Sequence, residues 1–225
     1  MTKSLDRPLN IVLLGPPGSG KSTIAEAIVR EHDLVVIATG QRLRAEIQSR
    51  SALGRAVKPY LDKGDLAPDS LMDRLLRASL EGLDQRQGFL LDGYPRTLHQ
   101  AHGLDGMLAD FERQLDAVIA LQVGDEEVVR RLSGRRICEG AGEPFPVHID
   151  DLSSVIRCQE RGGHLVARDD DQPEIVRQRL VVYHRQTQPL LEFYQTTNLL
   201  HRVDARGTPA EVARRAIAAI ESVRG

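Results

Sequence analysis

The stretch GPPGSGKST, from Gly15 to Thr23, lies between an apolar run, Asn10–Leu14, and a segment of helical pattern that begins at Ile24. Its spacing, Gly-x-x-x-x-Gly-Lys-Ser, is typical of a phosphate-binding loop that follows a strand and opens a helix. Glycine leaves backbone N–H groups free to converge on phosphate oxygens, and the helix N-terminus adds positive potential. The stretch therefore predicts a strand, a phosphate cradle and a helix.

Two side chains of this loop have expected roles. Lys21 should reach the β- and γ-phosphates of a bound nucleotide, and Ser22 should ligate Mg²⁺. The residues of the loop expected to bind ATP are Gly15, Gly18, Ser19, Gly20, Lys21, Ser22 and Thr23. The loop alone does not distinguish a GTPase, an ATPase motor and a small-molecule kinase.

Composition excludes several other classes. The chain has 225 residues and a formal net charge of −2, so it lacks the global basic field that non-specific nucleic-acid binding uses, and no nucleic-acid partner is expected. No apolar stretch approaches the ~20 residues needed to span a bilayer, so no membrane partner is expected. With two cysteines and a short, polar N-terminal segment, the sequence favours a reducing, cytoplasmic setting.

Short apolar runs alternate with longer amphipathic segments along the chain. The expected buried strands are residues 10–14, 34–37, 88–91, 117–123 and 199–203. The expected helices are residues 21–31, 41–50, 69–83, 98–111, 126–131, 173–194 and 209–223, with Asp69 and Asp125 at N-cap positions. Five continuous apolar runs separated by helices predict an α/β fold with a parallel sheet. Residues 136–167 lack a helical period and are expected to form an irregular or small-sheet insertion.

A second motif narrows the chemistry. GFLLDGYPRT, residues 88–97, is an apolar strand that ends in Asp92, which suits a carboxylate near a Mg²⁺ shell at the carboxyl edge of the sheet. Four more motifs follow the same order along the chain: ATGQRLR at 38–44, GRR at 134–136, ARDDD at 167–171 and RQRLVVYH at 177–184. Together with the phosphate-binding loop, this set closely resembles the adenylate kinase family, from about Asn10 to about Tyr194.

The resemblance implies a fold and a division into lobes. It implies a three-layer α/β P-loop kinase core with a five-stranded parallel sheet, occupying residues 1–225 as one unit with two insertions. A lobe over residues 39–67 would close on the nucleoside monophosphate, and a lid over residues 135–169 would close on ATP. The expected assembly is a monomer.

The resemblance also implies residue roles. Thr39 would lie near the acceptor base, Arg44 and Arg96 would bind the acceptor phosphate, and Gln100 would hydrogen-bond the adenine. The full set expected at AMP is Thr39, Gly40, Arg44, Gly93, Arg96, Gln100, Arg168 and Arg179. On the ATP side Arg131 and Arg135 join the loop, while Asp170 and Asp171 match acids at the hinge of the lid. Pro95 matches a proline that is often cis in the family.

The implied reaction, MgATP + AMP giving two ADP, requires no general base. A phosphate monoester has a second pKa of about 6, so the acceptor is already ionised at neutral pH. The protein must hold two anions in line and spread positive charge over the transferred group, which suits Mg²⁺, lysine and bidentate arginines. The expected catalytic residues are Lys21, Asp92, Arg96, Arg135, Arg168 and Arg179, with Ser22 and Asp92 at the Mg²⁺, Asp92 through water.

Departures from the family pattern keep alternatives open. The loop has Ser22 where glycine is common, Gln41 replaces a usual Asp, and Tyr94 replaces a common Phe. A UMP/CMP kinase shares the loop and most arginines, although Thr39, Gln100 and the long lid favour adenine. A nucleotide-binding regulator without turnover would be expected to lack Lys21 or a phosphate-facing arginine, and none is missing.

The lid is expected to hold no structural zinc. Many long-lid relatives bind Zn²⁺ through four ligands, of which Cys138 and Cys158 match the first and third, but Ala141 and Arg161 occupy the other two positions. The expected state is a pair of neighbouring reduced thiols, for which a disulfide is feasible under oxidation but disfavoured in a reducing cytoplasm. The expected small core beside them is Phe145, Val147 and Ile149.

Overall fold

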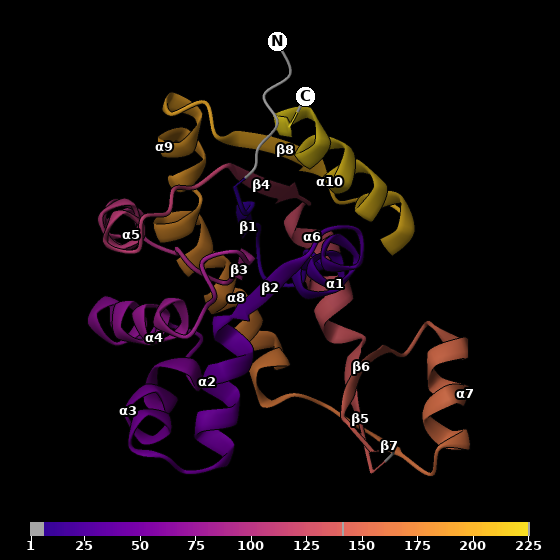
Figure 1. Ribbon diagram of the computed structural model, residues 1–225. Coiled ribbons are helices and arrows are strands. Elements are labelled where there is room, and N and C mark those ends of the chain that lie inside the picture. Colours follow the sequence, from indigo (N-terminus) through magenta and orange to yellow (C-terminus); the bar gives the residue numbers. More distant parts are fainter. Residues whose placement is uncertain (1–6, 141, 225) are drawn as a thin grey trace.

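A five-stranded parallel sheet forms the centre of the molecule (Figure 1). The computed structural model describes residues 7–140 and 142–224. Within them the strand order is β2-β3-β1-β4-β8. The strands are β1 (Asn10–Leu14), β2 (Leu34–Ala38), β3 (Gly88–Asp92), β4 (Ala117–Gln122) and β8 (Leu200–Asp204). The predicted fold class is confirmed, and the strand bounds agree with the expected ones to within one residue.

Helices cover both faces of this sheet. On one face lie α1 (Lys21–Glu31) and α10 (Pro209–Arg224); the other is covered by α4 (Asp69–Glu81), α5 (Leu98–Asp110) and α9 (Leu190–Thr196) (Figure 1). Successive residues of a strand point to opposite faces, so each strand supplies both layers. Ile11 and Leu13 of β1 belong to the core beneath α1 and α10, whereas Val12 and Leu14 belong to the other. This two-sided burial explains why the three central strands β1, β3 and β4 are mostly apolar, whereas the edge strand β8 carries His201 and Arg202.

Two segments project from the sheet's carboxyl edge. The first carries α2 (Thr39–Gln48) and α3 (Ala52–Leu61), and the sequence analysis missed α3. The second follows α6 (Asp125–Ser133) and forms an antiparallel sheet of β5 (Arg135–Glu139), β6 (Phe145–His148) and β7 (His164–Val166) with α7 (Leu152–Glu160) beside it (Figure 1). The small sheet was expected, but α7 was not. Asp151 caps α7 by accepting a hydrogen bond from Ser154 N.

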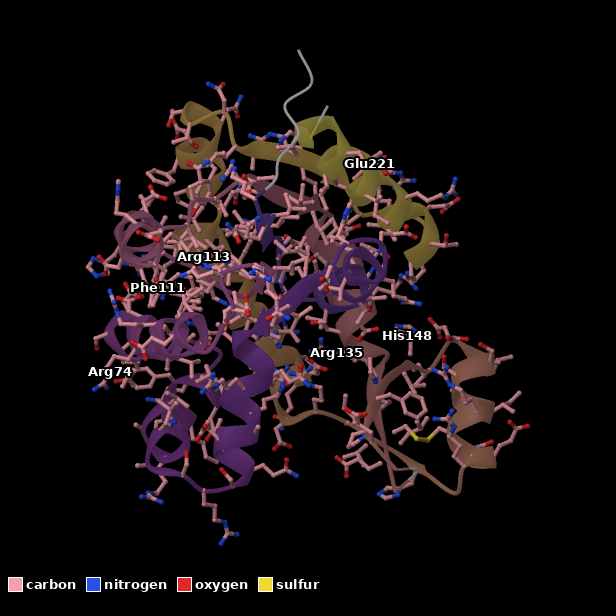
Figure 2. The ribbon with its side chains drawn as sticks, viewed as in Figure 1. Arg74, Phe111, Arg113, Arg135, His148 and Glu221 are labelled. Atoms are coloured by element: carbon pink, nitrogen blue, oxygen red, sulfur yellow. A yellow bond between two sulfur atoms is a disulfide. The ribbon has the colours of Figure 1, made fainter. Side chains whose placement is uncertain are left out.

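The two cysteines of the second segment form a disulfide, so the expectation of reduced thiols is wrong. β5 and α7 place the Cα atoms of Cys138 and Cys158 5.8 Å apart, and both residues are fully buried. The yellow bond is visible in Figure 2 between the small sheet and α7. Val147 and Phe145 pack against the bridge as expected, but Ile149 is 44% exposed because it follows the end of β6. Ala141 lies outside the described residues.

Three local expectations also need correction. The stretch 173–194 is α8 (Pro173–Val182), a π-helical turn at Tyr183–Thr187 and α9, rather than one helix. The break begins at the π-helical turn and ends at Pro189, which lacks an N–H donor and holds the N-cap position of α9. Asp69 and Asp125 are the first helical residues, and Pro68 and Gly124 hold the N-cap positions. Within the described residues, the carboxylates of Asp69 and Asp125 make no cap hydrogen bond and instead contact residues outside their own helices.

No helix in the described ranges is long and apolar enough to cross a membrane.

Candidate nucleotide site at the carboxyl edge of the sheet

The phosphate-binding loop joins β1 to α1, and its last residue before the helix, Gly20, has a left-handed backbone conformation. Gly20 has φ 93° at the N-cap of α1, a conformation that glycine adopts without steric cost. Lys21 folds back over the loop, and its Nζ donates to the carbonyl oxygens of Gly15 and Pro16, both at 2.8 Å. Burial, together with nearby arginines, lowers the pKa of Lys21 to about 7, although Asp92 opposes the shift. A bound anion would restore the charged form of this lysine.

Ser22 and Asp92 bring two oxygens together beside the loop. β3 ends at Asp92, and Ser22 Oγ donates to Asp92 Oδ2 at 2.7 Å. Hydroxyl and carboxylate oxygens suit Mg²⁺, which takes few protein ligands and keeps water and substrate phosphates as the rest. Among the described residues there is no cluster of three or more His, Cys, Asp or Glu side chains able to hold a metal. The pair therefore fits a Mg²⁺ ion that arrives with a nucleotide.

The acceptor side lies where β2 and β3 end next to each other. Ala38 of β2 pairs with Asp92 of β3, so Thr39 and Gly93 follow from neighbouring strands. Thr39 Oγ1 donates to the Asp92 carbonyl at 3.3 Å. Gly93 has φ 91°, and a Cβ there would lie 2.8 Å from Thr39 Oγ1 and 3.1 Å from Arg96 Nη2. This tight approach explains the glycine at position 93.

Two guanidinium groups converge on Gly40. A Cβ at Gly40 would lie 3.4 Å from Arg44 Nη1 and 4.0 Å from Arg96 Nη2. Burial lowers the pKa of Arg96, although Asp92 and Asp170 partly offset the effect. Two cationic groups this close leave room for one anion between them.

The backbone of Arg96 is held from both sides. Its N–H donates to Gln100 Oε1 at 2.7 Å, and its carbonyl accepts from Thr187 Oγ1 at 2.9 Å. The Arg96 Nε also donates to the Gly93 carbonyl at 2.9 Å. The Tyr94–Pro95 peptide bond next to it is cis. Sequence reasoning missed Thr187, because a threonine in a π-helical turn carries no motif.

Gln100 makes its contacts inside the protein. It is 1% exposed, and its Nε2 donates to Asp69 Oδ1 at 2.7 Å while its Oε1 accepts from Arg96. Asp69 Oδ2 accepts from Thr97 Oγ1 at 3.0 Å. The sequence analysis read Asp69 only as a helix cap, and the structure makes it the partner of the glutamine expected at adenine.

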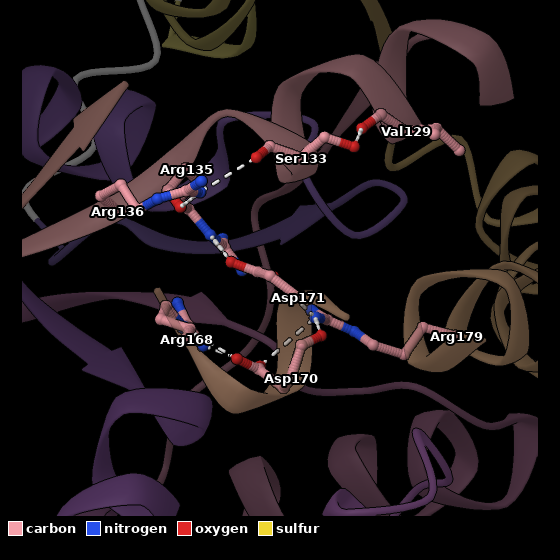
Figure 3. A network of polar contacts seen from close by, with 8 residues as sticks. All are labelled: Val129, Ser133, Arg135, Arg136, Arg168, Asp170, Asp171 and Arg179. Carbon is pink, nitrogen blue, oxygen red and sulfur yellow. Dashed lines mark hydrogen bonds and ion pairs between the residues drawn. The ribbon is translucent and has the colours of Figure 1, made fainter. Parts of the chain in front are cut away.

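Arginines from the second segment and α8 meet two aspartates (Figure 3). Arg135 binds Asp171 through two bonds of 2.7 and 2.6 Å, and Arg168 binds Asp170 through two of 2.9 and 2.8 Å. Arg179 Nη1 donates to the Asp170 carbonyl at 2.8 Å. Burial raises the pKa of Asp170, but Arg168, Arg179 and Arg135 together hold it below its usual value. Burial lowers the pKa of Arg179 to about 10. The three arginines thus form one network with both acids.

Arg131 lies against the phosphate-binding loop. Its Nη2 donates to the Ala205 carbonyl at 2.8 Å and its Nε to Glu127 at 2.7 Å, while Nη1 lies 3.5 Å from the Ser19 carbonyl oxygen. Leu132, the next residue of α6, packs so closely on Gly18 that a Cβ there would approach it to 2.8 Å. The structure therefore places α6, and Arg131 with it, beside the loop.

Comparison with known proteins agrees with this geometry. The family model described as "Adenylate kinase" matches residues 13–199. The chain is 45% identical to "Adenylate kinase" of Acidothermus cellulolyticus over 94% of this chain and 98% of the relative. It is 43% identical to "Adenylate kinase" of Methanocella arvoryzae, with 96% and 100% covered, and 41% identical to that of Pyrococcus abyssi, with 92% and 93% covered. With its loop, its two groups of arginines and these relatives, the chain belongs to the adenylate kinase family.

Proposed function

We propose that the protein transfers the γ-phosphoryl group of MgATP to AMP and forms two ADP reversibly. The observation that carries the proposal is the arrangement around Asp92: Lys21 and Ser22 of the loop on one side, and Gly40, Arg44 and Arg96 on the other. A donor phosphate on the loop and an acceptor phosphate at the paired arginines would meet at this edge of the sheet. The family and its curated relatives support this reaction over a UMP/CMP kinase or an inactive regulator.

Each group has a proposed role in binding or charge stabilisation. The backbone of residues 15–23 cradles the ATP phosphates, with Lys21 on the transferred group and Arg131 near the nucleotide. The acceptor phosphate binds Arg44 and Arg96, while Thr39, Gly40, Gly93 and Gln100 surround the acceptor nucleoside. The remaining arginines, Arg135, Arg168 and Arg179, turn from their aspartates to the transferred phosphoryl group. No side chain needs to remove a proton, because the acceptor is already ionised.

Magnesium would be held by Ser22 and, through water, by Asp92. Held there, Mg²⁺ would supply positive charge that offsets the negative charge developing on the phosphates during transfer. The protein supplies the preformed pair of oxygens at 2.7 Å.

Two lobes would close over the substrates. Residues 39–67, with α2 and α3, would cover AMP, and residues 135–169, with the small sheet and α7, would cover ATP. Closure would exclude water that otherwise hydrolyses ATP, and would bring the arginines in only when substrate is present. We further propose a monomer that acts in the cytoplasm. A reducing cytoplasm disfavours a persistent disulfide, so the redox state of Cys138 and Cys158 in cells also tests this location.

A coupled assay with the purified full chain tests the reaction. ATP, Mg²⁺ and AMP should give ADP, and ADP with Mg²⁺ should give ATP and AMP. UMP and CMP are the comparison acceptors: turnover with either that equals or exceeds turnover with AMP would make the protein a pyrimidine nucleotide kinase. Nucleotide binding by folded protein without ADP formation would instead identify a regulator.

A further inference from the structure

The amide of Gln100 is fixed in one orientation by partners of opposite kind. Its Oε1 faces the Arg96 backbone N–H, which can only donate, at 2.7 Å. Its Nε2 faces a carboxylate oxygen of Asp69, which as an ionised group can only accept, also at 2.7 Å. Rotating the amide by half a turn would set donor against donor and acceptor against acceptor. Because Gln100 is 1% exposed, water cannot freely repair such a mismatch.

Asp69 is itself firmly placed. It is the first residue of α4, where the helix dipole favours a negative charge, and its second oxygen accepts from Thr97 Oγ1 at 3.0 Å. Thr97 in turn caps α5 by accepting from Gln100 N at 3.1 Å. α4 and α5 pack side by side (Figure 1), so the carboxylate bridges two helices to reach the glutamine.

Because the Gln100 amide cannot rotate, it presents one hydrogen-bond donor and one acceptor to a nucleobase in a fixed order. One N–H of Nε2 and one lone pair of Oε1 remain after the two internal bonds. Adenine presents a ring-nitrogen acceptor beside an exocyclic amino donor, which complements that pattern. Hypoxanthine and guanine present a ring N–H donor beside a carbonyl acceptor, which complements only the rotated amide. A locked glutamine would thus select against the oxo-purines, whereas a freely rotating one would accept both.

We propose that Asp69 is the positioning residue that sets this selection: it locks the Gln100 amide in the orientation that accepts an amino-purine and rejects an oxo-purine. The inference rests on the proposed role of Gln100 at the acceptor base. Asp69 acts through Gln100 and is assigned no contact with substrate.

The test compares kcat/KM for AMP and IMP in matched variants of the full chain. IMP differs from AMP only along the base edge that the amide would read. Asp69→Asn replaces an obligate acceptor by a group that can also donate to a rotated glutamine. Asp73→Asn is the matched control, because Asp73 lies one turn further along α4 and accepts from Tyr94 Oη at 2.8 Å. The same hydroxyl donates to the Gln100 backbone carbonyl at 3.3 Å, so this control disturbs the backbone contact and leaves the two amide contacts of Gln100 in place. Gln100→Leu reports separately whether Gln100 reads the base.

In Asp69→Asn the AMP-to-IMP ratio of kcat/KM should fall by about tenfold, the effect of removing one buried mismatch. KM for AMP should rise, KM for IMP should fall, and KM for ATP should stay constant; a purely structural defect would raise all three. Asp73→Asn should keep the wild-type ratio. Should Asp69→Asn fail to fold by circular dichroism, Asp69→Ser removes the same carboxylate with a smaller side chain.

The outcomes distinguish a failure of the positioning role of Asp69 from a failure of the base-reading role of Gln100. A wild-type ratio in Asp69→Asn, together with a reduced ratio in Gln100→Leu, overturns the positioning role and leaves Gln100 at the base. An unchanged ratio in Gln100→Leu overturns the role of Gln100 and the inference with it, while AMP turnover by the wild type leaves the proposed reaction standing.

Discussion

Ser22 Oγ and Asp92 Oδ2 lie 2.7 Å apart and share a hydrogen bond that joins the first turn of α1 to the end of β3. Asp92 is 8% exposed, and it pairs with Ala38 at the end of the neighbouring strand β2. The bond therefore holds together the two oxygens that we propose as Mg²⁺ ligands.

Asp92→Asn should weaken the dependence of activity on Mg²⁺. Removing the carboxylate that orients the ion's ligands should raise the Mg²⁺ concentration for half-maximal activity by about tenfold or more. Excess Mg²⁺ should restore part of the rate. The measurement is a Mg²⁺ titration at fixed ATP, with Asp110→Asn, an exposed partner of Arg77, as control. An unchanged midpoint in Asp92→Asn would place the ion elsewhere.

Lys21→Met and Arg96→Ala should each abolish most activity. Charge-stabilising groups in phosphoryl transfer contribute about 10³–10⁵ in kcat, so each variant should lose several orders of magnitude in kcat/KM while its circular dichroism spectrum stays native. Lys63→Met and Arg86→Ala, which change exposed cationic residues outside the site, serve as controls. A loss below about tenfold in the site variants would show that the assigned site is wrong.

The pKa of Lys21 predicts a pH dependence of stability with a definite sign. The folded, ligand-free protein holds this pKa near 7, below the value of 10.5 expected for an unfolded chain. Between these values the unfolded state binds the extra proton, so the stability contribution rises with pH, by at most about 1.4 kcal/mol per pH unit. Below pH 7 Lys21 is charged in both states, and the full cost of burying that charge lowers the stability of the folded protein.

Lys21→Met should remove this slope. The free energy of unfolding of the wild type, minus that of the variant, should therefore increase from about pH 7 to pH 10 in urea titrations without nucleotide. Saturating Mg²⁺ and ADP should flatten the difference, because a bound phosphate favours the charged lysine. Parallel curves for the two ligand-free proteins would contradict the shifted pKa.

Thr187→Val should weaken AMP binding selectively. The substitution keeps the volume but removes the hydrogen bond to the Arg96 carbonyl, and an unpaired buried acceptor costs about 1–3 kcal/mol. KM for AMP should rise several-fold, with KM for ATP unchanged. Thr187→Ser retains the hydroxyl and is the matched control. Equal effects on both substrates would mean that Thr187 supports the core rather than Arg96.

Reduction should loosen the second segment. The bridge closes a loop with a sequence separation of 20, for which the chain-entropy model gives about 3 kcal/mol. A reductant should accelerate amide hydrogen exchange in β5, β6 and α7 of the wild type, whereas the double variant Cys138→Ala/Cys158→Ala should be insensitive to it. Elemental analysis of the untagged protein completes the test: about one tightly held zinc per chain, with melting of this segment on chelation, would contradict the bridge.

The elements that follow from the sequence are those with strong local patterns. Apolar runs marked the core strands, although the run at β8 is broken by His201 and Arg202, and glycines at fixed spacing marked the loop and its lysine. α3 was not expected because Gly54 and Pro59 lie inside it, and both residue types disfavour a helix interior even where the apolar spacing is helical. α7 was not expected because it lies in a segment where Gly, Pro and His are scattered, which reads as irregular. The proximity of the two cysteines was expected, but the bridge was not, because the sequence alone does not give the redox state of a thiol pair.

Contacts between residues far apart in the sequence could not be predicted from the sequence either. Asp69 and Gln100 lie 31 residues apart, and Thr187 and Arg96 lie 91 apart, in segments whose packing no motif encodes. The arginines, by contrast, stood in recognisable motifs, yet nothing in those motifs showed that Arg135 and Arg168 each hold an aspartate through two bonds.

In the binding mode proposed above, those aspartate pairs would make substrate binding an exchange of anions at Arg135 and Arg168. Arg135 and Arg168 already have their positive charges compensated by Asp171 and Asp170, so a phosphate that takes an arginine must displace a carboxylate of matching fork geometry. Weakly charged or singly coordinating anions, such as chloride, compete poorly in such an exchange. The resident carboxylates would thus compete with every anion for these arginines, and an anion that forms two parallel hydrogen bonds would displace them more readily than chloride would.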